Sequence, residues 1–160
     1  MRIPDKIELI VADPLSLELF WDKGVLVRTE IRYGKGRQPT GMTAAGKMLH
    51  EALLRYVAGE IVVWPRVPMA LHEQPEFTRT VLTALRDNVP HGHTTTYAEL
   101  AALAGSPGAA RAVGRVMANN DWPLIIPCHR VLGADGALTG YSAEGGLELK
   151  RFLLQLEGAL

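Results

Sequence analysis

The sequence predicts an α+β protein in which a small N-terminal antiparallel sheet with a helix precedes a mainly helical C-terminal domain with a helix-turn-helix. Two observations support this prediction. Apolar residues alternate with polar ones over much of the first 33 positions, as in half-buried strands, and recur at three- and four-residue spacing later, as in amphipathic helices. Pro65 and Pro68 interrupt the chain between the two patterns. We therefore expect two domains, at residues 1–71 and 72–160.

The bulk composition limits the class of protein. The chain has 160 residues, of which 48% are hydrophobic, and its formal net charge is zero. Nucleic-acid-binding proteins are commonly basic, and this chain is not. A prediction that it binds nucleic acid therefore has to come from local sequence features. A single cysteine forms no internal disulfide, which fits a reducing compartment. We find no signal-peptide pattern and no apolar run of membrane-spanning length, so we expect a cytoplasmic protein without a membrane partner.

The N-terminal part contains three predicted strands and one helix. Residues 6–11 form the first strand, and residues 15–21 and 25–33 form a β-hairpin with one buried face. Residues 44–57 carry apolar side chains at helical spacing, Met48 among them, and a glycine at position 59 suits the end of that helix. Residues 61–64 are a candidate for a further strand. No constellation in this part suggests chemistry.

The C-terminal part is predicted to be a series of helices. A first helix covers residues 77–89. The loop after it holds His91 and His93, which we interpret as solvated because a metal site would need further ligands. Thr96 and Glu99 form a capping-box pattern, with the threonine as N-cap, at the start of the next helix.

A second short helix is predicted after a turn at Gly105. Ser106 and Pro107 suit its N-cap and first position, and two short helices joined by such a turn indicate a helix-turn-helix. Small residues dominate the start of this second helix: Gly108, Ala109, Ala110, Ala112 and Gly114. Such a surface permits close approach by a neighbouring helix or by the narrow minor groove of DNA. Arg111 is correspondingly either an ordinary surface side chain or one that enters the duplex.

The only cysteine, Cys128, lies in an apolar stretch in which Pro127 stiffens the approach. Two interpretations are open: an inert cysteine packed in a buried strand, or a reactive thiol beside His129. Neighbouring side chains of an extended chain point to opposite faces, so pairing the two requires a water bridge or a bend at the proline. Glu157, near the end of the last predicted helix, either is an exposed acid or orients the histidine.

Three motifs in this order resemble a known family. The sequence reads TTYAELA at 95–101, RAVG at 111–114 and IPCHRV at 126–131. These segments are similar to O6-alkylguanine-DNA alkyltransferases, also called methylated-DNA–protein-cysteine methyltransferases, over roughly residues 75–158. The resemblance implies direct repair of O6-alkylguanine in double-stranded DNA, with base flipping and irreversible alkyl transfer. It implies no cofactor, and we expect a monomer.

The resemblance also implies roles for individual residues. It makes Cys128 the nucleophile and His129 the base, acting through a water. It assigns to Glu157 the orientation of His129, and to Asn120 a supporting position in the same hydrogen-bond network. The hydroxyl of Tyr97 is implied to donate to the guanine during transfer.

DNA and pocket contacts are implied in the same way. Arg111 would occupy the space of the flipped base, and further DNA-binding positions are Ala109, Ala110, Gly114 and Thr95. The implied wall of the substrate pocket consists of Met117, Pro123, Val131 and Ser142. Some members of the family hold a structural zinc in the N-terminal domain. Because this chain has no cysteine there, we expect no metal.

The chemistry of the residues favours the same activity. The thiolate is the reactive form of cysteine, and dealkylation at carbon needs a soft nucleophile with a base nearby. A thioether is not readily hydrolysed and the chain has no second cysteine, so we expect one turnover per molecule. The chain departs from the family pattern at Asp121 and Trp122, where the bulky indole could narrow the pocket or stack on another group, and at Ala143 and Glu144.

Three other functions compete with this interpretation. A non-catalytic lesion-binding relative would hold the flipped base without reaction, but such proteins lack the cysteine. A DNA-binding regulator would carry polar side chains for base edges in its recognition helix, where this chain has mostly Ala, Gly and Val. A cysteine hydrolase built on Cys, His and Glu would turn over many ester or amide substrates.

Overall fold

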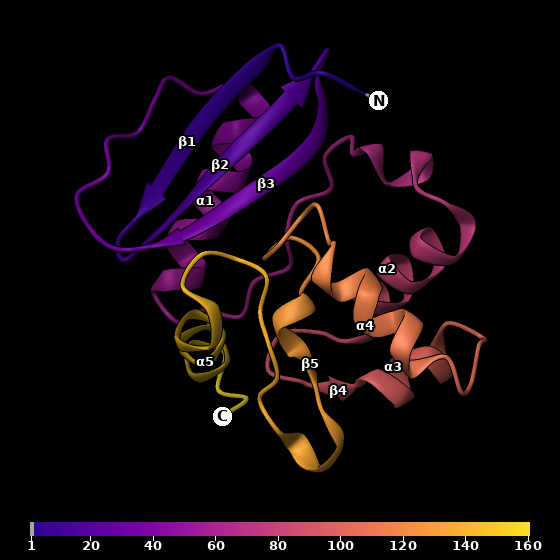
Figure 1. Ribbon diagram of the computed structural model, residues 1–160. Helices are drawn as coiled ribbons and strands as arrows, with labels where there is room; N and C mark the ends of the chain where they lie inside the picture. Colours follow the sequence, from indigo (N-terminus) through magenta and orange to yellow (C-terminus); the bar gives the residue numbers. More distant parts are fainter. Residues whose placement is uncertain (1) are drawn as a thin grey trace. The chain divides into compact units, whose positions relative to one another are not determined.

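The computed structural model describes residues 2–160, and they group into two compact units, one ending at Ala70 and the other covering Leu71–Leu160. In the first unit, strands β1 (Lys6–Ala12), β2 (Leu15–Asp22) and β3 (Val25–Tyr33) form an antiparallel sheet in that order. Helix α1 (Ala44–Val57) packs against this sheet (Figure 1). The predicted fold class is therefore confirmed for this part of the chain.

The central strand β2 is covered more completely than its alternating pattern predicts. Leu15, Leu17 and Leu19 are fully buried, as expected. Ser16 and Phe20, on the opposite face, are also buried, which corrects the expectation of a single buried face. One cause is the guanidinium of Arg28 on β3, which lies 3.8 Å from the centroid of the Phe20 ring.

A buried carboxylate joins the sheet to the start of α1. Glu8 on β1 is fully buried, and its Oε1 accepts hydrogen bonds from Trp21 Nε1 at 2.8 Å and from Thr43 Oγ1 at 3.0 Å. Its Oε2 accepts from the backbone N–H of Thr43, which is the N-cap residue of α1. A negative charge is favoured at a helix N-terminus, where backbone N–H groups lack partners within the helix. Glu8 therefore fixes where α1 begins and how it meets β1.

Two further expectations for the first unit are wrong. Residues 61–64 form no strand. The next residue is Pro65, which has no N–H to donate to a neighbouring strand. The chain forms a hydrogen bond with β3 only at Pro68, whose carbonyl accepts from Leu26 N at 2.7 Å. Met48, expected on the buried stripe of α1, is 48% exposed, because the buried side follows Leu49 and Leu53 instead.

The second unit is mainly helical. It contains α2 (Glu76–Asn88), α3 (Tyr97–Leu103), α4 (Ala110–Ala118) and α5 (Gly146–Leu156). Strands β4 (Thr95–Thr96) and β5 (Val131–Leu132) pair in parallel, and three short 3₁₀ turns complete it: η1 (Ala70–Glu73, starting at the unit boundary), η2 (Cys128–Arg130) and η3 (Ala134–Gly136). Helices α3 and α4 form the predicted helix-turn-helix. No helix within residues 2–160 is long and apolar enough to cross a membrane.

The two helices of this motif begin differently. The capping box of α3 is present as predicted: Thr96 Oγ1 accepts from Glu99 N, and Thr96 N donates to Glu99 Oε1, each at 3.1 Å. Helix α4 begins at Ala110 rather than at the predicted position 107. Gly108 has a φ of 89°, which an α-helix does not accommodate, so Ser106 to Ala109 form a separate turn closed by a 3.1 Å bond from Ala109 N to Ser106 O.

Gly46→Ala tests whether the Glu8 carboxylate is held rigidly. Alanine inside a helix is normally more stable than glycine by about 1 kcal/mol. At this position the added Cβ would overlap Glu8 Oε1, which Trp21 and Thr43 hold in place. We therefore expect a net loss of about 1–3 kcal/mol of unfolding free energy, seen as a lower urea midpoint.

Gly41→Ala is the control for that substitution, because its added Cβ would meet no atom within 4 Å. Its urea midpoint should stay close to that of the unmodified protein. A Gly46→Ala protein that is more stable than the unmodified one would show that the carboxylate moves aside at little cost.

Candidate active site

Cys128 lies at a sharp bend and not in an extended strand. Pro127 has φ and ψ of −81° and 64°, an inverse γ-turn, and Cys128 N donates to Ile126 O at 2.8 Å across it. The next three residues form the 3₁₀ turn η2. Side chains in a 3₁₀ turn leave the backbone at about 120° to each other, so Cys128, His129 and Arg130 point in three directions. The buried-strand interpretation of this stretch is therefore wrong.

Asn120 and β5 hold this bend from its two sides. Asn120 Nδ2 donates to Ile126 O at 3.0 Å, and its Oδ1 accepts from Trp122 N at 3.0 Å. After η2 the chain enters β5, in which Val131 pairs with Thr95. The cysteine is thus presented between two anchored segments. Asn120 braces the bend through backbone groups, and its predicted role in the network of His129 and Glu157 stays a prediction.

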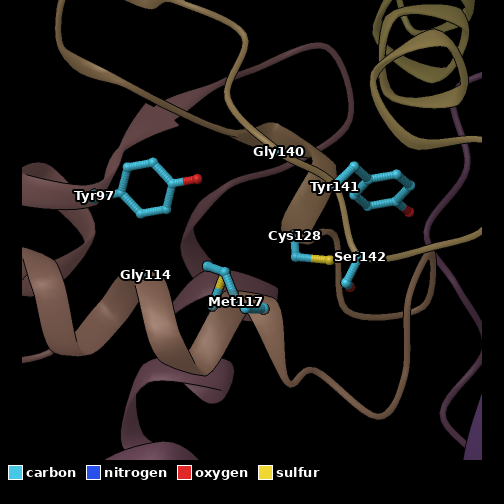
Figure 2. Close-up of a pocket in the computed structure, with 8 residues that line it drawn as sticks. Tyr97, Gly114, Met117, Cys128, Gly140, Tyr141 and Ser142 are labelled. Carbon is cyan, nitrogen blue, oxygen red and sulfur yellow. The ribbon is translucent and has the colours of Figure 1, made fainter.

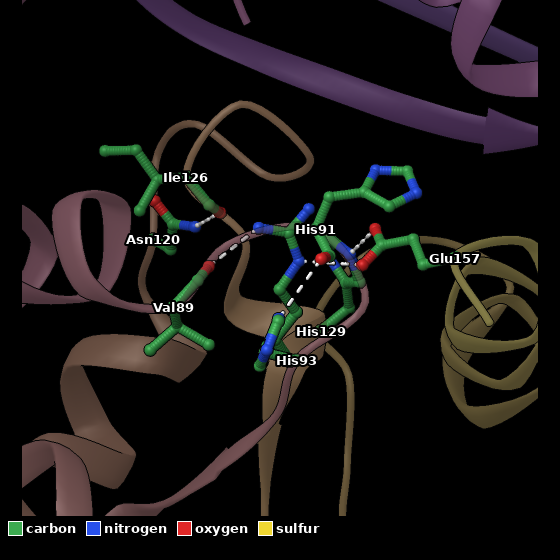
Figure 3. A network of polar contacts seen from close by, with 8 residues as sticks. Val89, His91, His93, Asn120, Ile126, His129 and Glu157 are labelled. Carbon is green, nitrogen blue, oxygen red and sulfur yellow. Dashed lines mark hydrogen bonds and ion pairs between the residues drawn. The ribbon is translucent and has the colours of Figure 1, made fainter. Parts of the chain in front are cut away.

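A buried network extends from η2 to the end of α5 (Figure 3). His129 Nε2 and Glu157 Oε2 are 2.6 Å apart, and Arg130 Nε donates to Glu157 Oε1 at 2.8 Å. Arg130 Nη1 also donates to Val89 O at 2.8 Å, at the end of α2. Glu157 is thus a buried partner of His129, and the alternative of an exposed acid is wrong.

The charges of this network follow from its contacts. Burial by itself would raise the pKa of Glu157, but the hydrogen bonds from His129 and Arg130, together with the positive charge of Arg130, outweigh it and hold that pKa well below its ordinary value. Burial lowers the pKa of His129, partly opposed by Glu157. At neutral pH the site therefore holds a carboxylate, a guanidinium and a neutral imidazole.

The carboxylate also selects the tautomer of His129. An ionised carboxylate only accepts hydrogen bonds, so the proton of the neutral ring lies on Nε2. Nδ1 then carries the free lone pair, and among residues 2–160 no side chain or backbone group donates to it. This nitrogen is the basic atom of the site.

Cys128 is protonated at rest. Burial raises the pKa of its thiol above the ordinary 9.0, while a hydrogen bond from Asn120 and the positive charge of Lys150 act in the opposite direction. Lys150 on α5 is buried and donates from Nζ to Val131 O at 2.8 Å. The resting site is therefore a thiol near a neutral base and not a thiolate–imidazolium pair.

The thiol opens into a cavity of about 370 Å³ (Figure 2). Four predicted site residues besides Cys128 line it: Tyr97, Gly114, Met117 and Ser142. The other lining residues are Ala118, Gly140 and Tyr141. The second helix of the helix-turn-helix forms one wall, and the loop before α5 forms another. The fully buried Trp122 is not part of the lining and belongs to the core. The expectation that its indole narrows the pocket is therefore wrong.

The remaining predicted residues lie elsewhere in the second unit. Pro123 and Val131 are buried but do not line the cavity, because Pro123 bridges to Ile126 and Val131 lies in β5, so their pocket roles stay predictions. Thr95 is also buried, since β4 pairs with β5, and its hydroxyl is not offered on the surface. Arg111 is exposed on α4, as a DNA contact requires.

Ala109 and Ala110 are half-buried at the start of α4, and their DNA contacts stay predictions. His91 is half-buried and not solvated as expected, and this burial lowers its pKa. No group of three His, Cys, Asp or Glu side chains within residues 2–160 is arranged to hold a metal ion.

Three residues that the sequence did not single out complete the site. Arg130 shares the Glu157 carboxylate, Lys150 contacts β5 beside the cysteine, and Thr139 Oγ1 lies 2.6 Å from the Tyr97 hydroxyl. Arg130 directly follows Cys128 and His129 in the chain, and this position was a signal that it belongs to the site. Lys150 and Thr139 lie 19 and 42 residues from their partners, and no local pattern indicates either contact.

A model of the family described as 6-O-methylguanine DNA methyltransferase, DNA binding domain, matches residues 76–159, which is more than half of the chain. The chain belongs to this family. The matched range contains η2, the helix-turn-helix and the network around Glu157, so the family's matched domain coincides with the candidate site.

Methyltransferases of several organisms are similar in sequence. The chain is 47% identical over 104 residues to a methylated-DNA–protein-cysteine methyltransferase of Methanosarcina acetivorans, covering 65% of this chain and 64% of that protein. It is 48% identical over 94 residues to the human protein of the same name, covering 59% of this chain and 44% of the human one. The chain thus spans less than two thirds of the length of these curated relatives.

Solved structures of this methyltransferase family resemble nearly the whole chain. A Mycobacterium tuberculosis O6-methylguanine methyltransferase has a TM-score of 0.76 and 35% identity, covering 96% of this chain and 92% of that one. The M. tuberculosis protein crystallised in complex with DNA has a TM-score of 0.74 and 37% identity, covering 93% and 91%. The α+β fold of both units is therefore that of the methyltransferases.

The protonated state of Cys128 is testable with a small alkylating reagent. Iodoacetamide reacts with the thiolate, and the chain has one cysteine, so the rate reports Cys128 alone. Because burial raises the pKa of the thiol, we expect the rate to rise with pH and reach its midpoint above 9.0. Glutathione measured under the same conditions is the reference. A midpoint below 9.0 would mean that Asn120 and Lys150 outweigh burial.

Glu157→Gln should destabilise the protein strongly. The substitution leaves the guanidinium of Arg130 buried without its counter-charge, which costs about 3 kcal/mol or more of unfolding free energy at pH 7. Because the pKa of Glu157 is depressed in the folded protein, its ionisation stabilises the fold above about pH 4.5 and this contribution is lost as the pH falls further. The difference between the two proteins should therefore shrink below that pH.

Glu148→Gln is the matched control, because Glu148 is an exposed acid in the first turn of the same helix. We expect a change of about 0.5 kcal/mol for it, from the helix dipole alone. Equal urea midpoints for the two glutamine variants would contradict a stabilising role of the buried network.

Proposed function

We propose that this protein repairs DNA directly by moving the alkyl group of O6-alkylguanine onto Cys128. One observation carries the proposal: the only cysteine of a methyltransferase-family chain opens into a cavity of about 370 Å³, next in sequence to a buried His129 whose Nδ1 is basic. The lone reactive thiol and its base are what alkyl transfer requires.

The reaction needs the thiol proton to be removed first. Because Cys128 is protonated at rest, His129 Nδ1 takes the proton through a bridging water. The imidazolium that forms is stabilised by the Glu157 carboxylate, which already accepts from Nε2 at 2.6 Å. Arg130 keeps that carboxylate ionised and in place, so the base is oriented before the substrate arrives.

The transfer step is a displacement at the alkyl carbon. The Cys128 sulfur forms a bond to that carbon as the bond from carbon to O6 breaks, and the electron pair stays on the guanine. The Tyr97 hydroxyl donates a hydrogen bond to the leaving guanine and stabilises its developing negative charge. The product is a thioether on Cys128, so the chain reacts once and is not regenerated.

Access to the substrate requires extrusion of the nucleotide. The O6 atom of a stacked guanine is out of reach of a buried thiol, so the base has to rotate into the cavity. Helix α4 offers small residues, Ala110 and Gly114, for close approach to the minor groove, and the exposed Arg111 for the space that the base leaves. Double-stranded DNA is thus the proposed partner, with the protein acting as a monomer.

The proposal is tested by a single-turnover reaction with duplex DNA carrying O6-methylguanine with an isotopically labelled methyl group. Peptide mass spectrometry should find the label on Cys128, rising to one methyl per protein and no further. Cys128→Ser, which keeps the size but loses the thiolate, should bind the DNA and remain unlabelled. Tight lesion binding with an unlabelled Cys128 would instead support a non-catalytic lesion sensor, and turnover beyond one would support a hydrolase.

A further inference from the structure

Two hydroxyl groups meet at the edge of the cavity. The Tyr97 hydroxyl and Thr139 Oγ1 are 2.6 Å apart, although the residues are 42 positions apart in the chain. Tyr97 is the first residue of α3, and Thr139 lies in the loop between η3 and α5. Figure 2 shows the Tyr97 ring on one side of the cavity with its hydroxyl directed inward. The contact joins the helix-turn-helix to the opposite cavity wall.

Packing fixes the orientation of Thr139. A Cβ at Gly133 would lie 3.0 Å from Thr139 Cγ2, so the methyl group packs against the bare Cα of this glycine. The carbonyl of Thr139 accepts from Lys150 Nζ at 3.4 Å, and the same ammonium donates to Val131 O at 2.8 Å. With its methyl and carbonyl held in this way, Thr139 presents its hydroxyl to Tyr97.

Each of the two hydroxyls has one proton, and only one of these two protons lies between the oxygens. When Tyr97 donates to Thr139, the phenolic proton is used inside the pair and is not available to a base in the cavity. When Thr139 donates to Tyr97, the phenolic proton is free to point at a base in the cavity. The hydrogen bond from Thr139 also polarises the phenolic O–H group. Tyr97 then becomes a stronger hydrogen-bond donor to the base that accepts from it.

We propose that Thr139 is the positioning residue of Tyr97: its hydroxyl donates to the phenolic oxygen and so aims the Tyr97 proton at the leaving guanine. This inference rests on the proposed function, because it supplies the donor that the transfer step uses. Thr139 touches neither the guanine nor the alkyl group. Its effect falls on the transfer step and leaves the binding of DNA unchanged.

The experiment compares Thr139→Val, Thr139→Ser, Tyr97→Phe and the double variant Thr139→Val/Tyr97→Phe. Valine has the shape of threonine without the hydroxyl, and serine keeps the hydroxyl without the methyl. Single-turnover transfer to Cys128 is measured over a range of O6-methylguanine duplex concentrations. This gives the maximal rate and, separately, the DNA concentration at half-maximal rate.

We expect Thr139→Val to lower the maximal rate roughly 5- to 10-fold, the effect of one lost hydrogen bond, at an unchanged half-saturating DNA concentration. Thr139→Ser should restore most of the rate. In the Tyr97→Phe background the valine substitution should have no further effect, because there is no phenolic oxygen left to position.

Several outcomes would overturn the inference. These are an unchanged rate in Thr139→Val, losses that multiply in the double variant, absent rescue by serine, or a loss confined to DNA binding. A Tyr97→Phe protein as fast as the unmodified one would show that the Tyr97 hydroxyl is not used in the transfer step, which removes the premise of this inference. Label on Cys128 in the same experiment would still support alkyl transfer. An unmodified protein that labels no Cys128 would refute the proposed function itself, which distinguishes the two failures.

Discussion

The candidate site depends on one buried carboxylate. Glu157 is the C-cap of α5, where the helix dipole disfavours a negative charge, and burial adds a further cost. The hydrogen bonds from His129 and Arg130 and the charge of Arg130 more than compensate, since the pKa of the carboxyl is held well below its ordinary value. This arrangement fixes the end of α5 against η2 and, through Arg130, against the end of α2. A single group thus stabilises the second unit and orients the His129 ring.

The buried environment of Cys128 keeps its thiol protonated at neutral pH. Burial raises the pKa of Cys128 and lowers that of His129, so both groups are neutral in the resting protein. Asn120 and Lys150 limit the cost of forming the thiolate when the proton leaves. The burial that neutralises both groups and the polar contacts that oppose it therefore belong to the same site.

The walls of the cavity come from segments that are far apart in sequence. Helix α4 contributes Gly114, Met117 and Ala118, and the loop before α5 contributes Gly140, Tyr141 and Ser142. Lys150 and the Tyr97–Thr139 contact tie this loop to β5 and to α3. The loop is thus held in place by a few long-range polar contacts and not by secondary structure of its own, which makes each of those contacts consequential for the shape of the pocket.

The sequence by itself determined the three strands and the helix of the first unit, the helix-turn-helix and the capping box of Thr96, because each depends on residues close together in the chain. It misplaced the start of α4, because Gly108, which precedes the helix, adopts a left-handed conformation that composition does not reveal. Only the tertiary structure decided that Trp122 is core, that Glu157 has two buried partners and that Thr139 meets Tyr97. The reason is physical: such contacts join side chains brought together by packing over long chain separations, and no local pattern records them.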